Sequence, residues 1–218
     1  MGHKVHPTIF RIAVNKTWCS RWFSSTRAYA RFLREDNGIR KKIELDFKEG
    51  GVEKIDIERF GKDIELTVFV ARPGVVIGRG GVKSEKLKKE IEVIAGKNTK
   101  VQLTIKEVLK PNTSSQILVG SMAQEIERRI PFRRVMKKGI DQVMKGGAKG
   151  VKIIMGGRLN GAEIARSEML TSGSMPLHSL RADIDYARGV AKTIYGVIGI
   201  KVWVYKGDVF SSVSKTAE

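Results

Sequence analysis

The sequence has few of the side chains on which enzyme and metal sites most often depend. It contains one cysteine, Cys19, and three histidines in 218 residues. A single cysteine excludes both an intrachain disulfide and a cysteine zinc cluster. No stretch approaches the roughly 18 consecutive apolar residues of a membrane span, and residues 1–7 contain no apolar signal-peptide core. We therefore expect a cytoplasmic protein with no membrane partner and no cofactor.

Acidic residues are scarce relative to basic ones. The chain has 41 lysines and arginines against 23 aspartates and glutamates, which gives a net charge of +18 and a pI of about 10.1. A folded chain with this excess repels itself unless a polyanion neutralises it, and nucleic acid is the usual polyanion. An acidic membrane surface would require a basic helix with bulky apolar anchors, whereas the basic helices expected here have apolar faces suited to a protein core. We therefore predict a nucleic-acid partner.

The first half of the chain has the pattern of an α/β domain that follows a basic arm at residues 1–24. Apolar spacing indicates a helix that begins at Ser25, and residues 36–38, Asp-Asn-Gly, are expected to break or kink it before a second stretch at 39–47. Alternating residues then predict a β-hairpin. In order, the elements are strands at 52–59 and 64–70, a short helix at 75–77, a glycine loop at 78–81, a helix at 82–95 and a strand at 101–105.

The second half has a similar pattern after a boundary at residues 110–112. Helical spacing is expected at 113–129, and Pro131 is expected to open a further helix at its first position. Strands are expected at 151–155, 180–186 and 197–205. This half is therefore also α/β, with a mixed sheet, and a flexible tail is expected at 208–218.

The glycine loop is the first motif that points to a ligand. A nucleotide P-loop requires Gly-Lys-Ser/Thr at fixed spacing, but Val82 follows Gly81, and a dinucleotide fingerprint requires glycine where this chain has Lys83. A plain helix-start turn and a KH-type G-x-x-G turn remain. In a KH turn the glycines let the RNA backbone approach peptide N–H groups at a helix N-terminus. The element order is that of a type II KH domain, so we predict RNA contacts at Ile77, Gly78, Arg79, Gly80, Gly81 and Lys83.

A second candidate lies in the helix that follows Pro131. From Arg128 to Lys149 the chain has eight basic residues and one acid, Asp141. At 100° per residue, Arg133, Arg134, Lys137 and Lys138 span an arc of roughly 140°. The adjoining arc holds the apolar residues Met136, Ile140, Val143 and Met144. An ordinary solvated face usually mixes both signs of charge. We therefore predict phosphate contacts, which position RNA without reading its sequence, at Arg128, Arg129, Arg133, Arg134, Lys137 and Lys138.

Catalytic arrangements are missing from the sequence. No Ser/His/Asp or Cys/His set is evident. Asp183 and Asp185 share a face of a predicted strand and are the best candidates for a nuclease metal site. The nearby Arg166 and Arg181 favour structural ion pairs instead, so we expect no catalytic residue and no bound metal.

Seven stretches, taken together with their order and spacing, resemble the bacterial small-subunit ribosomal protein S-three family over nearly the whole chain. They are Gly2-His3-Lys4-Val5-His6-Pro7, Ala71-Arg72-Pro73-Gly74-Val75-Val76-Ile77-Gly78, Gly157-Arg158-Leu159, Gly161-Ala162-Glu163-Ile164-Ala165-Arg166, Pro176-Leu177-His178, Leu180-Arg181-Ala182-Asp183-Ile184-Asp185-Tyr186 and Tyr195-Gly196-Val197-Ile198-Gly199.

The resemblance implies a type II KH domain followed by a C-terminal α/β domain. It implies a structural, non-enzymatic place in the head of the small subunit, bound to 16S rRNA beside ribosomal proteins S-ten and S-fourteen. Family members line the mRNA entry channel, where a Phe-Arg-Arg segment with a lysine one turn later is implicated in mRNA unwinding. Here that segment is Phe132-Arg133-Arg134 with Lys137.

On this basis we expect a KH domain at 25–108 and a C-terminal ribosomal domain at 109–207. RNA contacts are also expected at Lys4, Arg11, Arg158 and Arg166. Two other functions remain open from the residues alone. One is a free KH-type RNA regulator or chaperone, and the other is a nuclease that uses Asp183 and Asp185.

Overall fold

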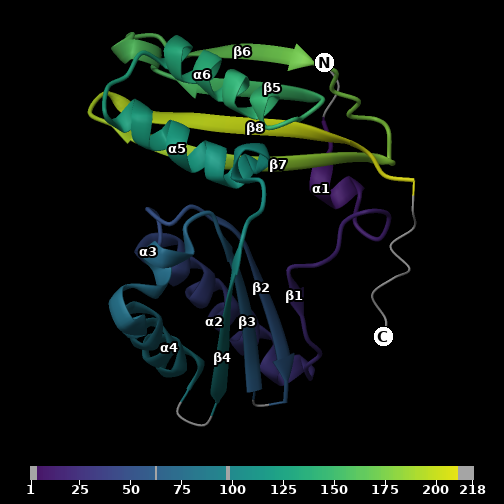
Figure 1. The fold of residues 1–218 in the computed structure, drawn as a ribbon, viewed down its shortest axis with the longest axis vertical. Coiled ribbons are helices and arrows are strands. Elements are labelled where there is room, and N and C mark those ends of the chain that lie inside the picture. The colour runs from purple at the N-terminus through teal and green to yellow at the C-terminus, as the bar shows by residue number, and fades with distance from the viewer. Residues whose placement is uncertain (1–3, 62, 97–98, 211–218) are drawn as a thin grey trace. The chain divides into compact units, whose positions relative to one another are not determined.

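The structure, a computed structural model, describes residues 4–61, 63–96 and 99–210 (Figure 1). The chain divides into two units. One spans Trp18–Leu109, and the other joins the described residues up to Thr17 to those from Lys110 onward. The chain therefore passes between the units twice, once after Thr17 and once after Leu109.

The first unit follows the predicted order of helix, hairpin, short helix, glycine loop, helix and strand. Within the described residues its sheet has the order β1-β2-β3-β4, with β2 and β3 antiparallel and both outer pairs parallel. The sheet is therefore mixed. The elements are β1 (Ser20–Arg21), α2 (Thr26–Asp46), β2 (Val52–Phe60), β3 (Asp63–Val70), α3 (Pro73–Ile77), α4 (Val82–Ala95) and β4 (Lys100–Glu107).

The core of this unit follows directly from the alternation in the hairpin. Ile57 on β2 and Leu66 on β3 are fully buried and paired in register. Helices α2 and α4 cover them through Ile43 and Ile91, which are also fully buried. Each such side chain contributes about 1.5–3 kcal/mol by leaving water. The core therefore fixes both helices, and with α4 the position of the glycine loop.

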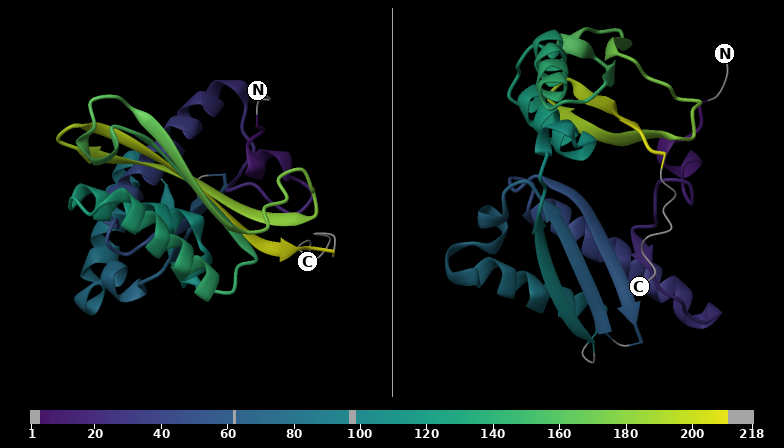
Figure 2. Two further views of the ribbon diagram at one scale, coloured as in Figure 1. Left: turned by 90° about the horizontal axis from the view of Figure 1, so that it is seen from above. Right: turned by 45° about the vertical axis from the view of Figure 1, so that its right-hand side comes forward.

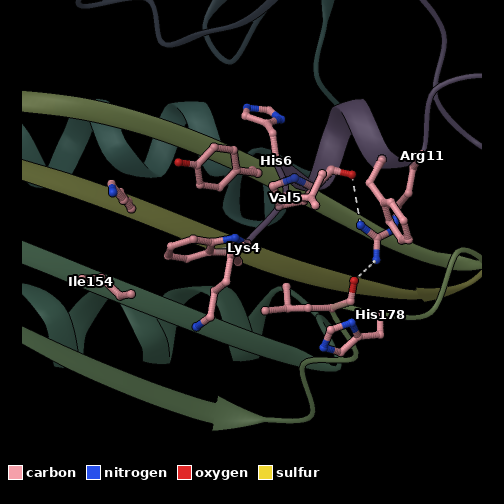
Figure 3. Close-up of a pocket in the computed structure, with 12 residues that line it drawn as sticks. Lys4, Val5, His6, Arg11, Ile154 and His178 are labelled. Atoms are coloured by element: carbon pink, nitrogen blue, oxygen red, sulfur yellow. Dashed lines mark hydrogen bonds between the residues drawn. The ribbon is translucent and has the colours of Figure 1, made fainter. Parts of the chain in front are cut away.

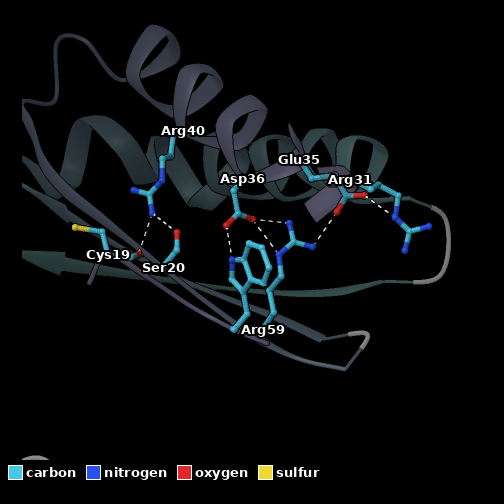
Figure 4. A network of polar contacts seen from close by, with 8 residues as sticks. Cys19, Ser20, Arg31, Glu35, Asp36, Arg40 and Arg59 are labelled. Atoms are coloured by element: carbon cyan, nitrogen blue, oxygen red, sulfur yellow. Dashed lines mark hydrogen bonds and ion pairs between the residues drawn. The ribbon is translucent and has the colours of Figure 1, made fainter. Parts of the chain in front are cut away.

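The predicted break in α2 at Asp36-Asn37-Gly38 is wrong, because the helix runs without interruption from Thr26 to Asp46. Asp36 is buried, and its carboxylate accepts hydrogen bonds from Trp22 Nε1 at 2.8 Å and Arg59 Nε at 2.9 Å (Figure 4). Gly38 lies beside α4, where a Cβ would be in ordinary van der Waals contact with Ile94 at 3.5 Å. Asp36 therefore serves tertiary contacts, and neither Asp36 nor Gly38 ends the helix.

The second unit contains two long helices and an antiparallel sheet. Within the described residues the strand order is β6-β5-β8-β7, and every pairing is antiparallel. The prediction of a mixed sheet in this half is therefore wrong, and β6 was not predicted. The elements are α1 (Pro7–Phe10), α5 (Ser115–Glu127), α6 (Phe132–Lys145), β5 (Gly150–Gly157), β6 (Arg166–Gly173), β7 (Ala182–Thr193) and β8 (Gly196–Asp208).

The two faces of this sheet differ. Helices α5 and α6 pack on one face, α5 over β7 and β8 and α6 over β5 and β6 (Figure 2). Val151, Ile153 and Val202 point to that face and are fully buried. Because side chains alternate along a strand, Ile154 and Trp203 point to the opposite face, where they belong to a separate small cluster. We call this opposite side the outer face.

No helix in the described part of the chain is long and apolar enough to cross a membrane. The predicted flexible tail at 208–218 falls mostly outside the described residues, although Asp208 still belongs to β8.

Candidate nucleic-acid interface

The glycine loop begins at the C-terminus of α3 and ends at the N-terminus of α4. Gly78, Gly80 and Gly81 have φ of 72°, 62° and 81°, in the left-handed region that glycine adopts most readily. A Cβ on Gly78 would lie 2.9 Å from Cγ of Lys83, whereas nothing lies within 4 Å of that position on Gly80. Glycine is thus required at Gly78 for both conformation and space, and the centre of the loop is open.

The surroundings of the loop suit an anion. Val76 is buried and anchors α3, while Ile77 is 39% exposed beside the loop. The backbone of Arg79 belongs to the short 3₁₀ segment Arg79–Gly81, which leads into the 14-residue helix α4. The free N–H groups and dipole of a helix N-terminus favour negative charge. Lys83, on the first turn of α4, is exposed.

The basic face of α6 forms a continuous ridge, which we define as Arg133, Arg134, Lys137 and Lys138. All four side chains are exposed. They line a groove of about 720 Å³, completed by Asn112, Asp141, Gln142 and Lys145. The predicted helix therefore has its charged arc in solvent, although it begins at Phe132 and Pro131 is its N-cap.

The other face of α6 is packed against the sheet. Val135, Met136 and Val143 are buried, as is Phe132 at the start of the helix. Met144, predicted to face inward, is 36% exposed. The ridge is therefore carried by a helix that is packed on the sheet, and its backbone sets the order of the four cations.

Acidic partners neutralise only part of the ridge. Arg133 forms an ion pair with Glu168 at 3.3 Å, and Lys138 forms one with Glu125. The hydrogen bond from Arg133 lowers the pKa of the Glu168 carboxyl. Within the described residues, no acidic oxygen lies within 4 Å of Arg134 or Lys137. These two cations are available to an external anion.

The structure brings Arg166 to the start of the ridge. Arg166 shares the Glu168 carboxylate with Arg133, at 3.3 Å from each. Both guanidinium groups lie 5.8 Å from the ring of Phe132. Glu168 and β6 were not recognised in the sequence, because β6 is an edge strand whose residues are all exposed or half-buried.

Three further arginines that were predicted to contact RNA, Arg128, Arg129 and Arg158, differ in how far they are free to bind it. Arg128 and Arg129 follow α5 and are exposed, and Arg129 has a positive φ of 65°. Arg158 is half-buried and donates to the carbonyl oxygens of Ala162 at 2.9 Å and Tyr195 at 3.1 Å. Its guanidinium thus stabilises the turn after β5, in addition to any contact with RNA.

The predicted RNA contact at Arg11 is wrong, because the side chain is fully buried. Its guanidinium is used entirely within the fold and holds residues 4–17 against β7 and the preceding loop (Figure 3). It donates to the carbonyl oxygens of Pro7, Pro176, Leu177, Ser179 and Ala182. Lys4, by contrast, is exposed.

Asp183 and Asp185 serve structural contacts. Asp183 pairs with Lys16 at 2.6 Å, and Asp185 accepts a hydrogen bond from the Ser115 N–H at 2.9 Å. The predicted partners, Arg166 and Arg181, pair with Glu168 and Asp208 instead. Across residues 4–61, 63–96 and 99–210 no group of three His, Cys, Asp or Glu side chains is arranged to hold a metal ion.

Comparison with known proteins assigns both units. The family model described as "KH domain" matches residues 38–113, and "Ribosomal protein S3, C-terminal domain" matches residues 122–204. The small ribosomal subunit protein uS3 of Paraburkholderia phymatum is 49% identical over 208 residues, which cover 95% of this chain and 78% of that protein. The same protein of Burkholderia thailandensis is 50% identical over 208 residues, covering 95% of this chain and 77% of the relative. The chain therefore belongs to the small ribosomal subunit protein uS3 family.

Proposed function

We propose that the chain is a structural constituent of the head of the small ribosomal subunit, where it binds 16S rRNA and lines the mRNA entry channel. It acts by binding and not by catalysis, as expected for this family of ribosomal proteins. Ribosomal proteins S-ten and S-fourteen are its proposed protein neighbours.

The observation that carries the proposal is the ridge on α6. Its exposed cations lie on a helix whose other face is buried, and Arg134 and Lys137 have no acidic partner within 4 Å among the described residues. An arginine presents a planar fork that matches phosphate oxygens, and a lysine adds a point charge. The ridge is therefore suited to hold a single strand by its backbone.

The mechanism requires no nucleotide hydrolysis by this chain. A paired mRNA that opens transiently at the channel entrance exposes phosphates, and the ridge binds them in single-stranded form. Binding that favours the open state shifts the equilibrium by its differential affinity for that state. Translocation of the ribosome then draws the opened strand inward.

The experiment is translation through a stable mRNA hairpin by ribosomes carrying Arg133→Ala, Arg134→Ala and Lys137→Ala. We expect slower hairpin transit, with normal speed on an unstructured message and subunit assembly largely intact. A matched control replaces the exposed Arg27, Lys41 and Lys100 by alanine, which removes the same charge from the first unit. Unchanged hairpin transit in the ridge variant would contradict the unwinding role.

Sedimentation separates the proposal from the notion of a free RNA regulator. Stoichiometric co-migration of the chain with small subunits in a cell lysate is expected. A pool that remains mainly at the top of the gradient would overturn the structural role.

A further inference from the structure

The outer face of the second sheet carries an aromatic array next to residues 4–17. Tyr186 on β7 is paired in register with Trp203 on β8, which is paired with Lys152 on β5. The Tyr186 and Trp203 rings are 5.0 Å apart between centroids, and His6 meets Tyr186 edge-on at 4.8 Å. Three rings from three separate stretches of the chain are thus brought together.

These rings line a pocket of about 420 Å³, which we call the aromatic pocket (Figure 3). Residues 4–11 form one wall, β5, β7 and β8 form the floor, and the loop with Leu177 and His178 closes one end. Trp203 is 8% exposed and lies in the floor, while Tyr186 is half-buried and His6 is exposed. The volume lies within the range of small-ligand sites.

The pocket is surrounded by positive charge without a matching acid. Lys4 and Lys201 line it, Lys152 has its Nζ 5.6 Å from the centre of the Trp203 ring, and Arg188 is paired in register with Lys201. Within the described residues, no acidic oxygen lies within 4 Å of any of these four cations, and the lining contains no Asp or Glu.

The cations also act on one another. Burial lowers the pKa of the Lys152 ammonium, and the neighbouring Lys4 lowers it further. The pKa of the His6 imidazole is lowered as well, first because the surrounding residues partly shield it from water and second because of the charge of Arg188. Mutual repulsion of this kind is relieved when an anion enters the cluster.

We propose that the aromatic pocket binds an unpaired nucleotide of RNA, with the base against Tyr186 and His6 and the adjoining phosphates near Lys4, Lys152 and Lys201. Aromatic side chains accept the face of any base, and lysines follow the phosphate backbone. This combination favours RNA over an acidic peptide, which would need the cations but not the ring faces. The inference rests on the proposed RNA-binding function and adds a second site, separate from the ridge on α6.

The test uses the full chain and a six-nucleotide single-stranded RNA of mixed sequence. The indole N–H resonance of Trp203, assigned by its loss in Trp203→Phe, is expected to shift as the RNA is added. The shift should persist in the variant with Arg133→Ala, Arg134→Ala and Lys137→Ala. It should require about tenfold more RNA in Lys4→Gln with Lys201→Gln, where two exposed residues change and the core is untouched.

The outcomes separate this pocket from the wider proposal. A Trp203 resonance that does not move while the RNA still binds would overturn the pocket and leave the ridge in place. RNA that fails to bind at all would contradict the RNA-binding function as well. In intact small subunits, ultraviolet crosslinking should join a nucleotide to a peptide that contains His6 or Tyr186. A crosslink from these residues to another protein would instead show that a protein fills the pocket.

Discussion

The Arg11 guanidinium donates a hydrogen bond to the Ala182 carbonyl oxygen at 2.7 Å, across 171 residues of sequence. The same side chain reaches two further loop carbonyls at 2.8 and 3.1 Å. One buried cation therefore joins the start of the chain to β7 and to the loop before it.

Replacing Arg11 by methionine should destabilise the second unit by about 3 kcal/mol. The substitution keeps an apolar stem of similar length but leaves several carbonyl oxygens without a donor, and each unpaired buried group costs about 1 kcal/mol or more. Limited proteolysis should then cut within residues 4–17 much faster than in the unchanged protein. Equal cleavage rates would show that other contacts hold this segment.

Asp36→Ala should destabilise the first unit by about 2–3 kcal/mol, because it removes the acceptor of Trp22 Nε1 and leaves the buried Arg59 with Glu35, at 2.8 Å, as its remaining carboxylate partner. The side chains of this pair are each 4% exposed. Hydrogen exchange should rise across β2 and α2 and stay unchanged in β5 and β8.

The control for Asp36 is Asp46→Ala on the same helix. Asp46 pairs with Lys42 at 3.1 Å, but both side chains are 36% exposed, and such pairs contribute about 1 kcal/mol or less. If the two variants lost similar amounts of unfolding free energy, the burial of the Asp36–Arg59 pair would not add to its contribution to stability.

Two glycine-to-alanine substitutions in the second unit should change the free energy of unfolding in opposite directions. A Cβ on Gly150 would lie 1.9 Å from the Ser174 carbonyl oxygen, so Gly150→Ala must displace backbone and should cost about 2 kcal/mol. Gly120 lies within α5 with nothing within 4 Å of the added atom, and alanine there should stabilise by about 0.5–1 kcal/mol. Thermal unfolding of the two variants measures the change in stability. Melting temperatures that move in the same direction would contradict the packing described.

Salt dependence should reveal how many phosphates the ridge holds. Each phosphate contact to a single strand contributes a slope of about 0.7 to log Kd against log salt. Removing Arg133, Arg134 and Lys137 should therefore reduce the slope for a single-stranded RNA by about two. A variant with the same net charge but changes at Arg27, Lys41 and Lys100 should keep the steeper slope.

The parts of the fold that could be predicted are those whose pattern lies within one short stretch of sequence. The bounds of α4, Val82–Ala95, follow from Gly81 and Gly96, which both have positive φ at its ends. The hairpin follows from strict alternation of buried and less buried residues. The ridge follows from helical periodicity, since its charged arc needs no knowledge of tertiary structure.

What could not be predicted depends on partners far away in sequence. Asp36 and Gly38 are residue types common at helix ends, yet α2 continues through them, and the Asp36 carboxylate is held by Arg59 of β2. Arg11 has the appearance of one more surface cation until the loop carbonyls around it are known. The pairing of Arg133 with Glu168 likewise required β6, which has no strong apolar alternation.

The contact of residues 4–17 with β7 also sets an order of events as the protein is made. Chains emerge N-terminus first at about 5–20 residues per second, so Arg11 is synthesised roughly ten to thirty seconds before Ala182. Trp18–Leu109 is continuous in sequence and can close its core within that interval. Residues 4–17 must therefore wait for β7, and the second unit is completed only after the whole of Trp18–Leu109 has been made.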